Sequence, residues 1–538
     1  MFKRYKSTKG ITLVALVITI IILLILAGIS ISTLTNTGIF EKAKEAKQKS
    51  ENAQKEEDRL ISEYEKEIVK QDAEGIWDGK VNKPDLMSGM SAIKFTEPTD
   101  STEGKDEKVS DSSKNDWYNY SEKKWANAQT EDGSMWVWIP RYAYKINKSN
   151  QTFDVIFLVG TTDNYYDKDG KLQTAKRQTS ETDIPDATKD YVVHPAFTNE
   201  SNIGYVNGGW KKELTGIWVS KFEAGYFDKN LVDADKEKYS SSVNYSQTYG
   251  YTTAGKNEDA RNYLDGVYGS KTTAIKYPTF QGGKYSMNYI NHNDAFNISK
   301  AIAGDSNNVY GLKNSTDSHL IKNSEWGAVA YLGQSQYGLY NKNIRINNVN
   351  MGDNSNFVYA MTGYAAKEED AENTINANAI AWNQFGGELA STTGTIYGIY
   401  DMSGGAWERT AAIVNNGNEN LNIYGKAIMN ALNNGKSTEY VTVYPNGETS
   451  GQSLDDASKS NYTANTKIYG DAIRETSTAG LGQTSWYSDY SYFVGTDNPF
   501  FVHGGTSWHT SVAGIFCFFR ADGNSSYTVG FRPVLVAQ

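Results

Sequence analysis

The first 71 residues divide into a basic leader, an apolar run and a charged segment. Residues 1–10 carry four basic side chains, and residues 11–31 are almost all apolar. A helix of that length measures about 30 Å, enough to cross a bilayer. Because positive charge stays on the cytoplasmic side, the pattern predicts a single-pass helix at 11–31 in the cell membrane, with the rest of the chain outside. Residues 32–71 place Glu and Lys three or four apart, which predicts a helical stalk; a solvated helix beside the membrane is the alternative.

The remaining chain changes character twice. Residues 72–125 are predicted to be a linker, because Ser, Asp, Lys, Gly and Thr dominate most of that stretch. From residue 126 the chain is rich in aromatic residues, and alternation at 136–146 predicts a strand. Short strands are also predicted at 155–159 and 215–224, and helices at 291–303 and at 324–332, the second capped by Ser324. Loops separate these elements, so residues 126–538 are predicted to form a loop-rich head.

Composition narrows the classes of function. The net charge is −10, and loss of the basic leader would make it more negative, so we expect no binding to nucleic acid, whose phosphates need a basic surface. Cys517 is the single cysteine, so an intramolecular disulfide cannot form. The 37 Tyr and 12 Trp suit an extracellular binding surface.

The N-terminus resembles the leader of a type IV prepilin. Residues 9–14 read KGITLV and place the small residue before the apolar run, whereas a secretory signal peptide has small residues after it. The resemblance implies that a prepilin peptidase cleaves between Gly10 and Ile11. Pilins usually carry Glu at the fifth mature position, where this chain has Ala15, so assembly with other pilin subunits in a pilus is left open. The alternative is an ordinary membrane anchor.

Five motifs resemble, in the same order, the sulfatase-modifying family of the formylglycine-generating enzymes. The most specific is YGIYDMSGGAWERT at 397–410. The others are WVSKFE at 218–223, Glu325-Trp326 with Ala330, HGGTSW at 503–508, and Arg520 with GFR at 530–532. The resemblance covers 126–538 and implies a C-type-lectin-like fold. The predicted fold class is therefore α+β, a long N-terminal membrane and stalk helix followed by a loop-rich C-type-lectin-like domain.

The same resemblance suggests which residues form the scaffold of the head. They are Trp407, Glu408, Gly504, Gly505, Trp508, Arg520, Phe531 and Arg532. We expect Trp407 and Trp508 to fill the core. We expect Glu408 and Arg532 to be buried partners, because charged side chains enter a core mainly in pairs.

The chain lacks some of the residues that the oxidases of this family need for catalysis. Its oxidases bind copper through two cysteines separated by four residues, and soft Cu(I) requires such thiolates. Cys517 stands near one of those positions, and Val512 occupies the other. Hydrolase, zinc-protease and P-loop motifs are also missing. We therefore expect no enzymatic activity, no catalytic residue and no cofactor. The family also has a calcium site, in which this chain has Gly405 in place of an Asn but keeps Glu408. Calcium binding is therefore an open alternative and is not predicted.

The C-terminal segment 499–535 resembles the variable region of proteins diversified by retroelements. In those proteins adenine-templated mutagenesis rewrites selected codons on a C-type-lectin-like scaffold. The variable-like segment here spans 506–528, and alternation over 515–519 predicts that side chains point inward and outward in turn. The predicted ligand-binding residues are Thr506, Ser507, His509, Thr510, Ser511, Cys517, Phe519, Ala521, Asp522, Ser525, Ser526 and Tyr527. The alternative is that these are ordinary loop residues.

Together these patterns predict a surface-anchored recognition or adhesion protein whose C-terminal patch binds an unidentified protein or glycan. A divergent sulfatase-modifying enzyme is the first alternative, and the absent second cysteine argues against it. A minor pilin or pseudopilin is the second alternative, and Ala15 argues mildly against that one.

Overall fold

The computed structural model describes most of the chain in two compact units, Met1–Asp72 and Ala73–Gln538. The described residues are 13–36, 38–72, 75–178, 183–199, 208–225, 278–284, 286–288, 290–303, 309–313, 316–349, 360–367, 379–435, 438–526 and 528–537.

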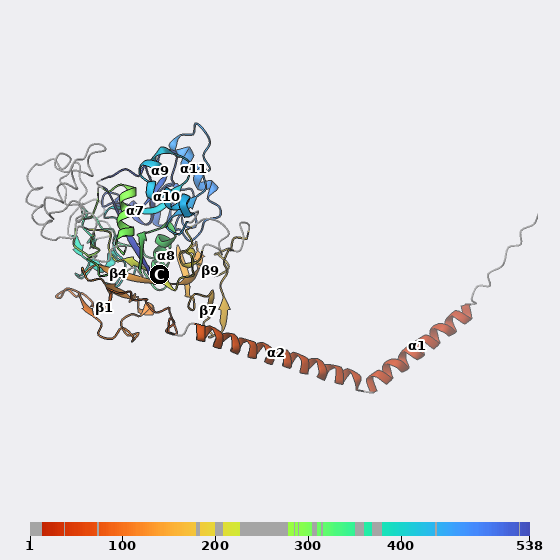
Figure 1. The fold of residues 1–538 in the computed structure, drawn as a ribbon. Helices are drawn as coiled ribbons and strands as arrows, with labels where there is room; N and C mark the ends of the chain where they lie inside the picture. Colours follow the sequence, from red (N-terminus) through yellow and green to blue (C-terminus); the bar gives the residue numbers. More distant parts are fainter. Residues whose placement is uncertain are drawn as a thin grey trace, which may run out of the picture. The chain divides into compact units, whose positions relative to one another are not determined.

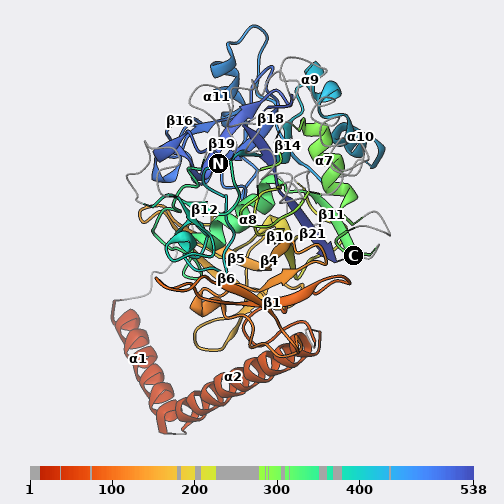
Figure 2. The same cartoon turned by 90° about the vertical axis from the view of Figure 1, so that its left-hand side faces the viewer.

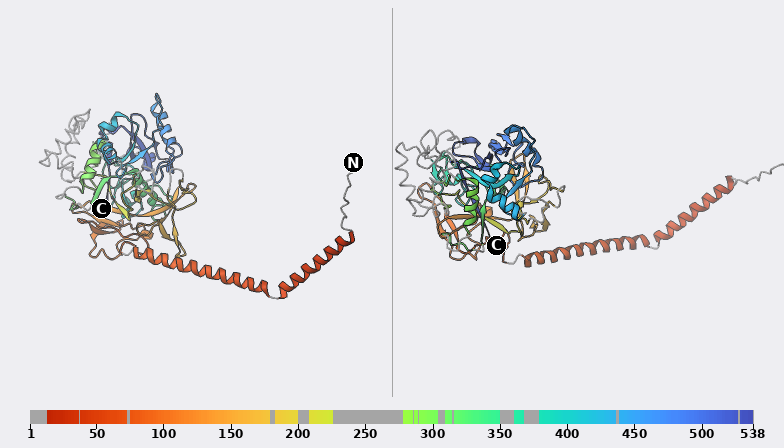
Figure 3. Two further views of the ribbon diagram at one scale, coloured as in Figure 1. Left: turned by 45° about the vertical axis from the view of Figure 1, so that its right-hand side comes forward. Right: turned by 45° about the horizontal axis from the view of Figure 1, so that its top comes forward.

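The first unit consists of two separate helices, α1 (Leu13–Asn36) and α2 (Ile39–Asp72) (Figure 3). Gly38 lies between them with φ of 64°, a left-handed conformation that glycine adopts readily and that cannot continue a right-handed helix. Among the described residues, none of the helices is at once long enough and apolar enough to pass through a membrane. The predicted fold class is therefore corrected: the structure does not contain one long membrane and stalk helix.

The second unit is a mixed α+β domain built around two seven-stranded sheets (Figures 1 and 2). In the first sheet all pairs are antiparallel. Its order is β11 (Thr316–Leu320), β21 (Pro533–Ala537), β10 (Gly216–Ser220), β4 (Met135–Pro140), β3 (Asn127–Gln129), β1 (Ser91–Thr96) and β2 (Lys105–Lys108). The central strands β4 and β10 are buried along their whole length, and the strand predicted at 215–224 is confirmed in outline. The single strand predicted at 136–146 is instead two strands, β4 here and β5 (Tyr142–Asn147) in a smaller sheet.

The second sheet is mixed and contains three strands of the C-terminal segment. Its order is β15 (Thr442–Tyr444), β14 (Trp407–Val414), β18 (Phe500–Gly504), β19 (Gly514–Ala521), β17 (Ser491–Tyr492) and β16 (Leu481–Gly482), with β20 (Val529–Phe531) also paired to β14. β14 is antiparallel to β18 and parallel to β15 and β20. The head thus contains two sheets of short strands, each two to eight residues long, with turns and loops between them.

Short elements complete the second unit. The small sheets comprise β5 (Tyr142–Asn147), β6 (Thr152–Phe157) and β9 (Val192–Val193); β7 (Asn164–Tyr166) and β8 (Leu172–Thr174); and β12 (Tyr364–Ala365) and β13 (Ile380–Ala381). The helices are α7 (His292–Ala301), α8 (Asn323–Gly333), α9 (Glu419–Ile423), α10 (Lys426–Gly435) and α11 (Leu454–Ala464). The single-turn 3-10 helices are η1 (Tyr120–Glu122), η2 (Pro195–Phe197), η5 (Gly387–Ala390), η6 (Trp486–Ser488) and η7 (Thr510–Val512).

The segment predicted as a linker, 72–125, belongs partly to the first sheet. Strand β1 lies within it and buries Ile93 and Phe95. Its neighbour β2 is exposed at all four residues, which accounts for the Lys, Asp and Glu in this stretch. The linker prediction is wrong for these residues because a polar edge strand has a composition similar to that of a flexible tether.

Helix α8 is fully buried and contacts both β4 of the first sheet and β14 of the second (Figure 2). The predicted helix at 324–332 is confirmed, but Lys322 rather than Ser324 is its N-cap residue. The Glu325 carboxylate accepts the backbone N–H of Lys322 at 2.9 Å, and the Trp326 indole N–H donates to the carbonyl of Ile515 at 2.8 Å. This helix therefore links the cores beneath the two sheets.

Replacing Gly327 in α8 with alanine is expected to destabilise the second unit by about 1–3 kcal/mol, or more. Alanine favours a helix by about 1 kcal/mol over glycine, but a Cβ here would overlap the backbone carbonyl of Gly470, which cannot move aside as a side chain can. Urea denaturation monitored by tryptophan fluorescence measures the change. Gly333→Ala is the control, because the atom nearest to its Cβ would be in the Thr392 side chain, at 3.3 Å. A Gly327→Ala variant as stable as wild type would contradict this packing.

Candidate ligand-binding surface

A group of aromatic rings lies over β17, β19 and the loop after β18. We call it the aromatic patch, and its members are Tyr490, Tyr492, Trp508, His509 and Phe519. Trp508 is 41% exposed, and the other four are half-buried. The Phe519 ring lies 5.7 Å from Tyr490 and 5.5 Å from Tyr492 between centroids. This packing holds the rings of Phe519, Tyr490 and Tyr492 in place while part of each stays accessible to a ligand.

The alternation of side chains along β19 places Phe519 in the patch. Cys517 and Phe519 share a cluster with Trp407, whereas Phe518 belongs to the cluster on the other side, with Phe501. Side chains at 517–519 therefore lie on alternate sides of β19, but the prediction that one set points outward is wrong for 515–518. Residues 514–518 are all buried, because both faces of the sheet are covered there. Only the C-terminal end of β19 reaches the surface.

The loop between β18 and β19 is held by hydrogen bonds around Thr506 and His509. The Thr506 backbone N–H donates to His509 Nδ1 at 3.1 Å, and the Thr506 hydroxyl lies 2.7 Å from the same atom. Because Nδ1 accepts the backbone N–H, the neutral ring carries its proton on Nε2. Burial lowers the pKa of His509 and favours this neutral form. The Ser507 N–H donates to the carbonyl of Gly405 at 3.0 Å, so the loop presents Trp508 from a fixed backbone.

The predicted ligand-binding residues differ in their access to solvent. Those at the surface or half-buried are His509, Thr510, Ser511, Phe519, Ala521, Asp522, Ser525 and Ser526, whereas Thr506, Ser507 and Cys517 are buried. Tyr527, Gly10 and Ile11 lie outside the described residues, so prepilin cleavage stays a prediction. Direct contact with a ligand is open to the first group, while the buried three lie under the surface.

The scaffold residues also divide. Trp407 is 6% exposed and its ring stacks on Phe519 at 5.7 Å, as expected for a core residue. The prediction that Trp508 fills the core is wrong, since its side chain is the most exposed of the patch. Gly504 and Gly505 have φ of 86° and 79°, so the turn out of β18 requires a conformation that favours glycine.

Arg520 stands at the rim of the patch. It donates to Asp455 at 2.7 Å and to the Ser458 hydroxyl at 2.9 Å. Its guanidinium lies 5.0 Å from the centre of the Tyr492 ring, a cation–π distance. Arg520 therefore ties the patch to α11 as well as to the sheet.

Glu408 and Arg532 form the buried pair predicted from the sequence, and this prediction is confirmed. Two guanidinium nitrogens of Arg532 donate to the Glu408 carboxylate at 2.8 and 2.7 Å, and both side chains are fully buried. Arg532 also donates to the carbonyls of Ser220, at the end of β10, and of Tyr400. Because Glu408 is on β14, the pair joins the two sheets below the patch.

Cys517 is unsuited to redox or metal chemistry in this position. Its side chain is completely buried, and burial raises the pKa of the thiol well above its ordinary value. Reactive and metal-binding cysteines are instead thiolates with lowered pKa values. Across the described residues no group of three or more His, Cys, Asp or Glu side chains is arranged to hold a metal ion.

A hollow of about 520 Å³ adjoins the loop, lined among others by Lys342, Arg345, Tyr487, Thr510 and Ser511.

The sequence analysis did not identify Tyr487, Tyr490 or Tyr492. The signal was present: WYSDYSY at 486–492 alternates Tyr with small polar residues, the composition of antibody paratopes. The cationic residues of the hollow carried no such signal, because they come from a distant loop.

Comparison with known protein families finds no family model that matches the chain. Comparison with curated proteins finds no match either.

Proposed function

We propose that the second unit is a recognition domain that binds a protein or glycan ligand through the aromatic patch. The observation that carries the proposal is the exposed Trp508 in a loop held by hydrogen bonds. Its neighbour in the chain, His509, lies 6.0 Å from the Tyr490 ring of the packed, half-buried group. Tyr and Trp bring large contact areas with few rotatable bonds, so binding costs little conformational entropy. Residues of these types also dominate the energetics of protein interfaces.

We further propose that the exposed positions of this segment vary among cells. Thr510 and Ser511 line the hollow beside the patch, and Asp522 is exposed at the end of β19. Substitution at such positions changes the binding surface and leaves the core intact, because surface changes usually alter stability little. This arrangement supports the resemblance to retroelement-diversified proteins noted in the sequence.

Deep sequencing of codons 505–531 across many cells of the source population tests the proposal. We expect adenine-derived substitutions to cluster at Thr510, Ser511, Asp522 and Ser525, with few at the buried Cys517. The codons for residues 400–410, which are all buried, provide the internal control.

A uniform segment, or one that varies no more than residues 400–410, would contradict diversification and leave a binding surface of fixed specificity. Substitutions concentrated at buried positions such as Gly505 and Phe531 would contradict the assignment of the patch as the binding surface.

A further inference from the structure

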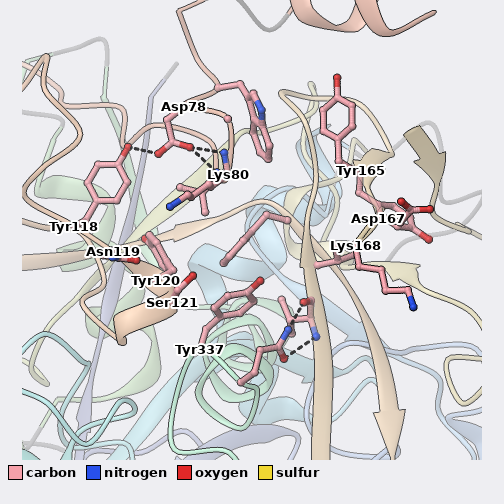
Figure 4. A pocket seen from close by; sticks show the side chains of 18 of the residues that line it. Asp78, Lys80, Tyr118, Asn119, Tyr120, Ser121, Tyr165, Asp167, Lys168 and Tyr337 are labelled. Carbon is pink, nitrogen blue, oxygen red and sulfur yellow. Dashed lines mark hydrogen bonds between the residues drawn. The ribbon is translucent and has the colours of Figure 1, made fainter. Parts of the chain in front are cut away.

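A second concave site lies in the N-terminal part of the same unit. It has a volume of about 860 Å³, within the usual range of ligand pockets. We call it the tyrosine cleft, and the aromatic residues that line it are Trp77, Tyr118, Tyr120, Phe157, Tyr165, Tyr166, Tyr191 and Tyr337. None of them belongs to the aromatic patch. Figure 4 shows Tyr118 and Tyr165 on opposite sides of the cleft, with Tyr337 between them.

The carboxylates of the cleft are held in place by hydrogen bonds. Asp78 accepts the hydroxyl of Tyr118 at 2.8 Å and the backbone N–H groups of Lys80 and Val81 at 2.7 Å. Asp154 accepts the hydroxyl of Tyr191 at 2.5 Å. A carboxylate has about four acceptor sites, so each of these two groups retains capacity for a ligand hydroxyl.

A third carboxylate occupies the turn between β7 and β8. Asp167 accepts the backbone N–H groups of Asp169 and Lys171 at 3.0 and 2.9 Å, which closes the turn. Asp167 and the adjacent Lys168 are both lining residues of the cleft, and Figure 4 shows them at its edge. Acceptors and a cationic donor therefore stand at the same rim.

The rings are packed against one another and do not swing freely. Tyr165 meets Tyr191 edge to face at 5.4 Å, and Tyr337 lies 4.6 Å from Phe157. Lys145 covers the Tyr191 ring at 4.5 Å. Tyr165, Tyr191 and Tyr337 remain half-buried, so part of each ring stays open to the cleft.

We propose that the tyrosine cleft binds a neutral oligosaccharide. A sugar ring has an apolar face of C–H groups that packs on aromatic rings, and a rim of hydroxyls that donate to carboxylates and accept from amides and lysines. The cleft supplies both kinds of partner side by side. Its lining contains Asp78, Asp154 and Asp167 against Lys80 and Lys168, so it is close to neutral and offers no basic surface for a polyanion.

An extended peptide cannot add to the edge of β6 at the cleft, because the backbone groups it would pair with are already bonded. An added strand needs free backbone groups at a sheet edge. At Val155 of β6 the backbone N–H donates to the side-chain oxygen of Gln336 at 3.3 Å, and its carbonyl accepts from the Gln336 amide at 2.6 Å. The Gln336 amide thus occupies the place of a neighbouring strand, and a glycan needs no such edge.

The test is binding of the purified full chain to an array of soluble neutral oligosaccharides, followed by titration of the best binder. Wild type is compared with Tyr165→Ala and Tyr166→Ala, each of which removes one ring from β7. We expect each variant to weaken binding about tenfold, the loss typical of one aromatic contact. Phe385→Ala is the matched control, because that ring is 56% exposed and lies outside the cleft; it should bind as wild type does.

Three results would overturn the proposal. Absence of any oligosaccharide that wild type binds is the first. The second is an oligosaccharide whose binding is unchanged in Tyr165→Ala and Tyr166→Ala but lost in Trp508→Ala, which would assign it to the aromatic patch. The third is binding of members of a displayed peptide library that depends on Tyr165, which would make the cleft a peptide site. Circular dichroism of each variant separates a lost contact from a lost fold.

Discussion

Replacing Glu408 with alanine is expected to lower the free energy of unfolding of the second unit by about 3–5 kcal/mol, the usual cost of leaving a buried charge without its partner. Arg532 would keep its bonds to the carbonyls of Ser220 and Tyr400, but neither carbonyl neutralises its charge. Burial raises the pKa of Glu408 to about 7, so the comparison is best made at pH 8, where the carboxylate is ionised. Urea denaturation monitored by tryptophan fluorescence measures the difference.

An exposed ion pair provides the control for this experiment. Glu122 and Lys124 lie 2.8 Å apart with side chains 58% and 41% exposed, and pairs of this kind contribute little. Glu122→Ala should therefore unfold almost as wild type does. A double variant, Glu408→Leu with Arg532→Leu, should recover part of the loss because no charge is left buried. If Glu408→Ala were as stable as Glu122→Ala, the pair would not be what joins the two sheets.

The Asp489→Asn variant is expected to gain stability relative to wild type as the pH rises from about 4 to about 8. Asp489 is fully buried and accepts the Phe516 backbone N–H at 2.9 Å. Burial raises the pKa of its carboxyl to about 8, so the folded protein keeps it protonated while the unfolded chain ionises it above about pH 4. The stabilisation that the protonated Asp489 gives the folded protein is complete below the pKa that Asp489 has in the unfolded chain. It is lost as the pH rises through the pKa that Asp489 has in the folded protein. Over this range the change in relative stability is on the order of 5 kcal/mol.

The measurement is a series of urea denaturation curves between about pH 2 and pH 9, because the contrast variant below responds only at acid pH. Asp317→Asn gives a contrast of opposite sign. Burial opposes ionisation of Asp317, but the hydrogen bond from His319 at 2.9 Å, the charges of His319 and Lys300 and the hydrogen bond from Tyr440 together outweigh it and lower the pKa of Asp317. The stabilisation from ionised Asp317 is present above the pKa that Asp317 has in the unfolded chain, and it is lost as the pH falls below that value. Parallel curves for Asp489→Asn and wild type would show that Asp489 is not held protonated.

Glu408 and Asp489 show which buried carboxylates a sequence motif can identify. Glu408 and Arg532 were paired from the sequence because each lies in a recognisable motif and a buried charge needs an opposite one. Asp489 lies in no motif, and its burial depends on Phe516, 27 residues away. A sequence motif identifies charged residues that need a partner when they are buried. Whether a residue outside a motif is buried depends on which distant segment of the chain packs against it.

The aromatic patch shows the same division. The sequence analysis proposed Phe519 and His509 as ligand-binding residues but placed Trp508 in the core, since a large apolar side chain beside two glycines suggests burial. The loop instead turns at Gly504 and Gly505, and its hydrogen bonds leave Trp508 exposed. The partners Tyr490 and Tyr492 join the patch through the pairing of β17 with β19, a contact that local pattern does not encode.

The sequence by itself determined the elements whose hydrophobic period is strong. These are the buried strands β4 and β10 and helix α8, together with the pairing of Glu408 with Arg532, because apolar periodicity and the cost of unpaired charge are local or pairwise properties. Only the tertiary structure decided that β1 and β2 extend the first sheet and that the tyrosine cleft exists. The cleft assembles residues from between 77 and 337, and such long-range contacts depend on the packing of the whole domain, which no single stretch of sequence specifies.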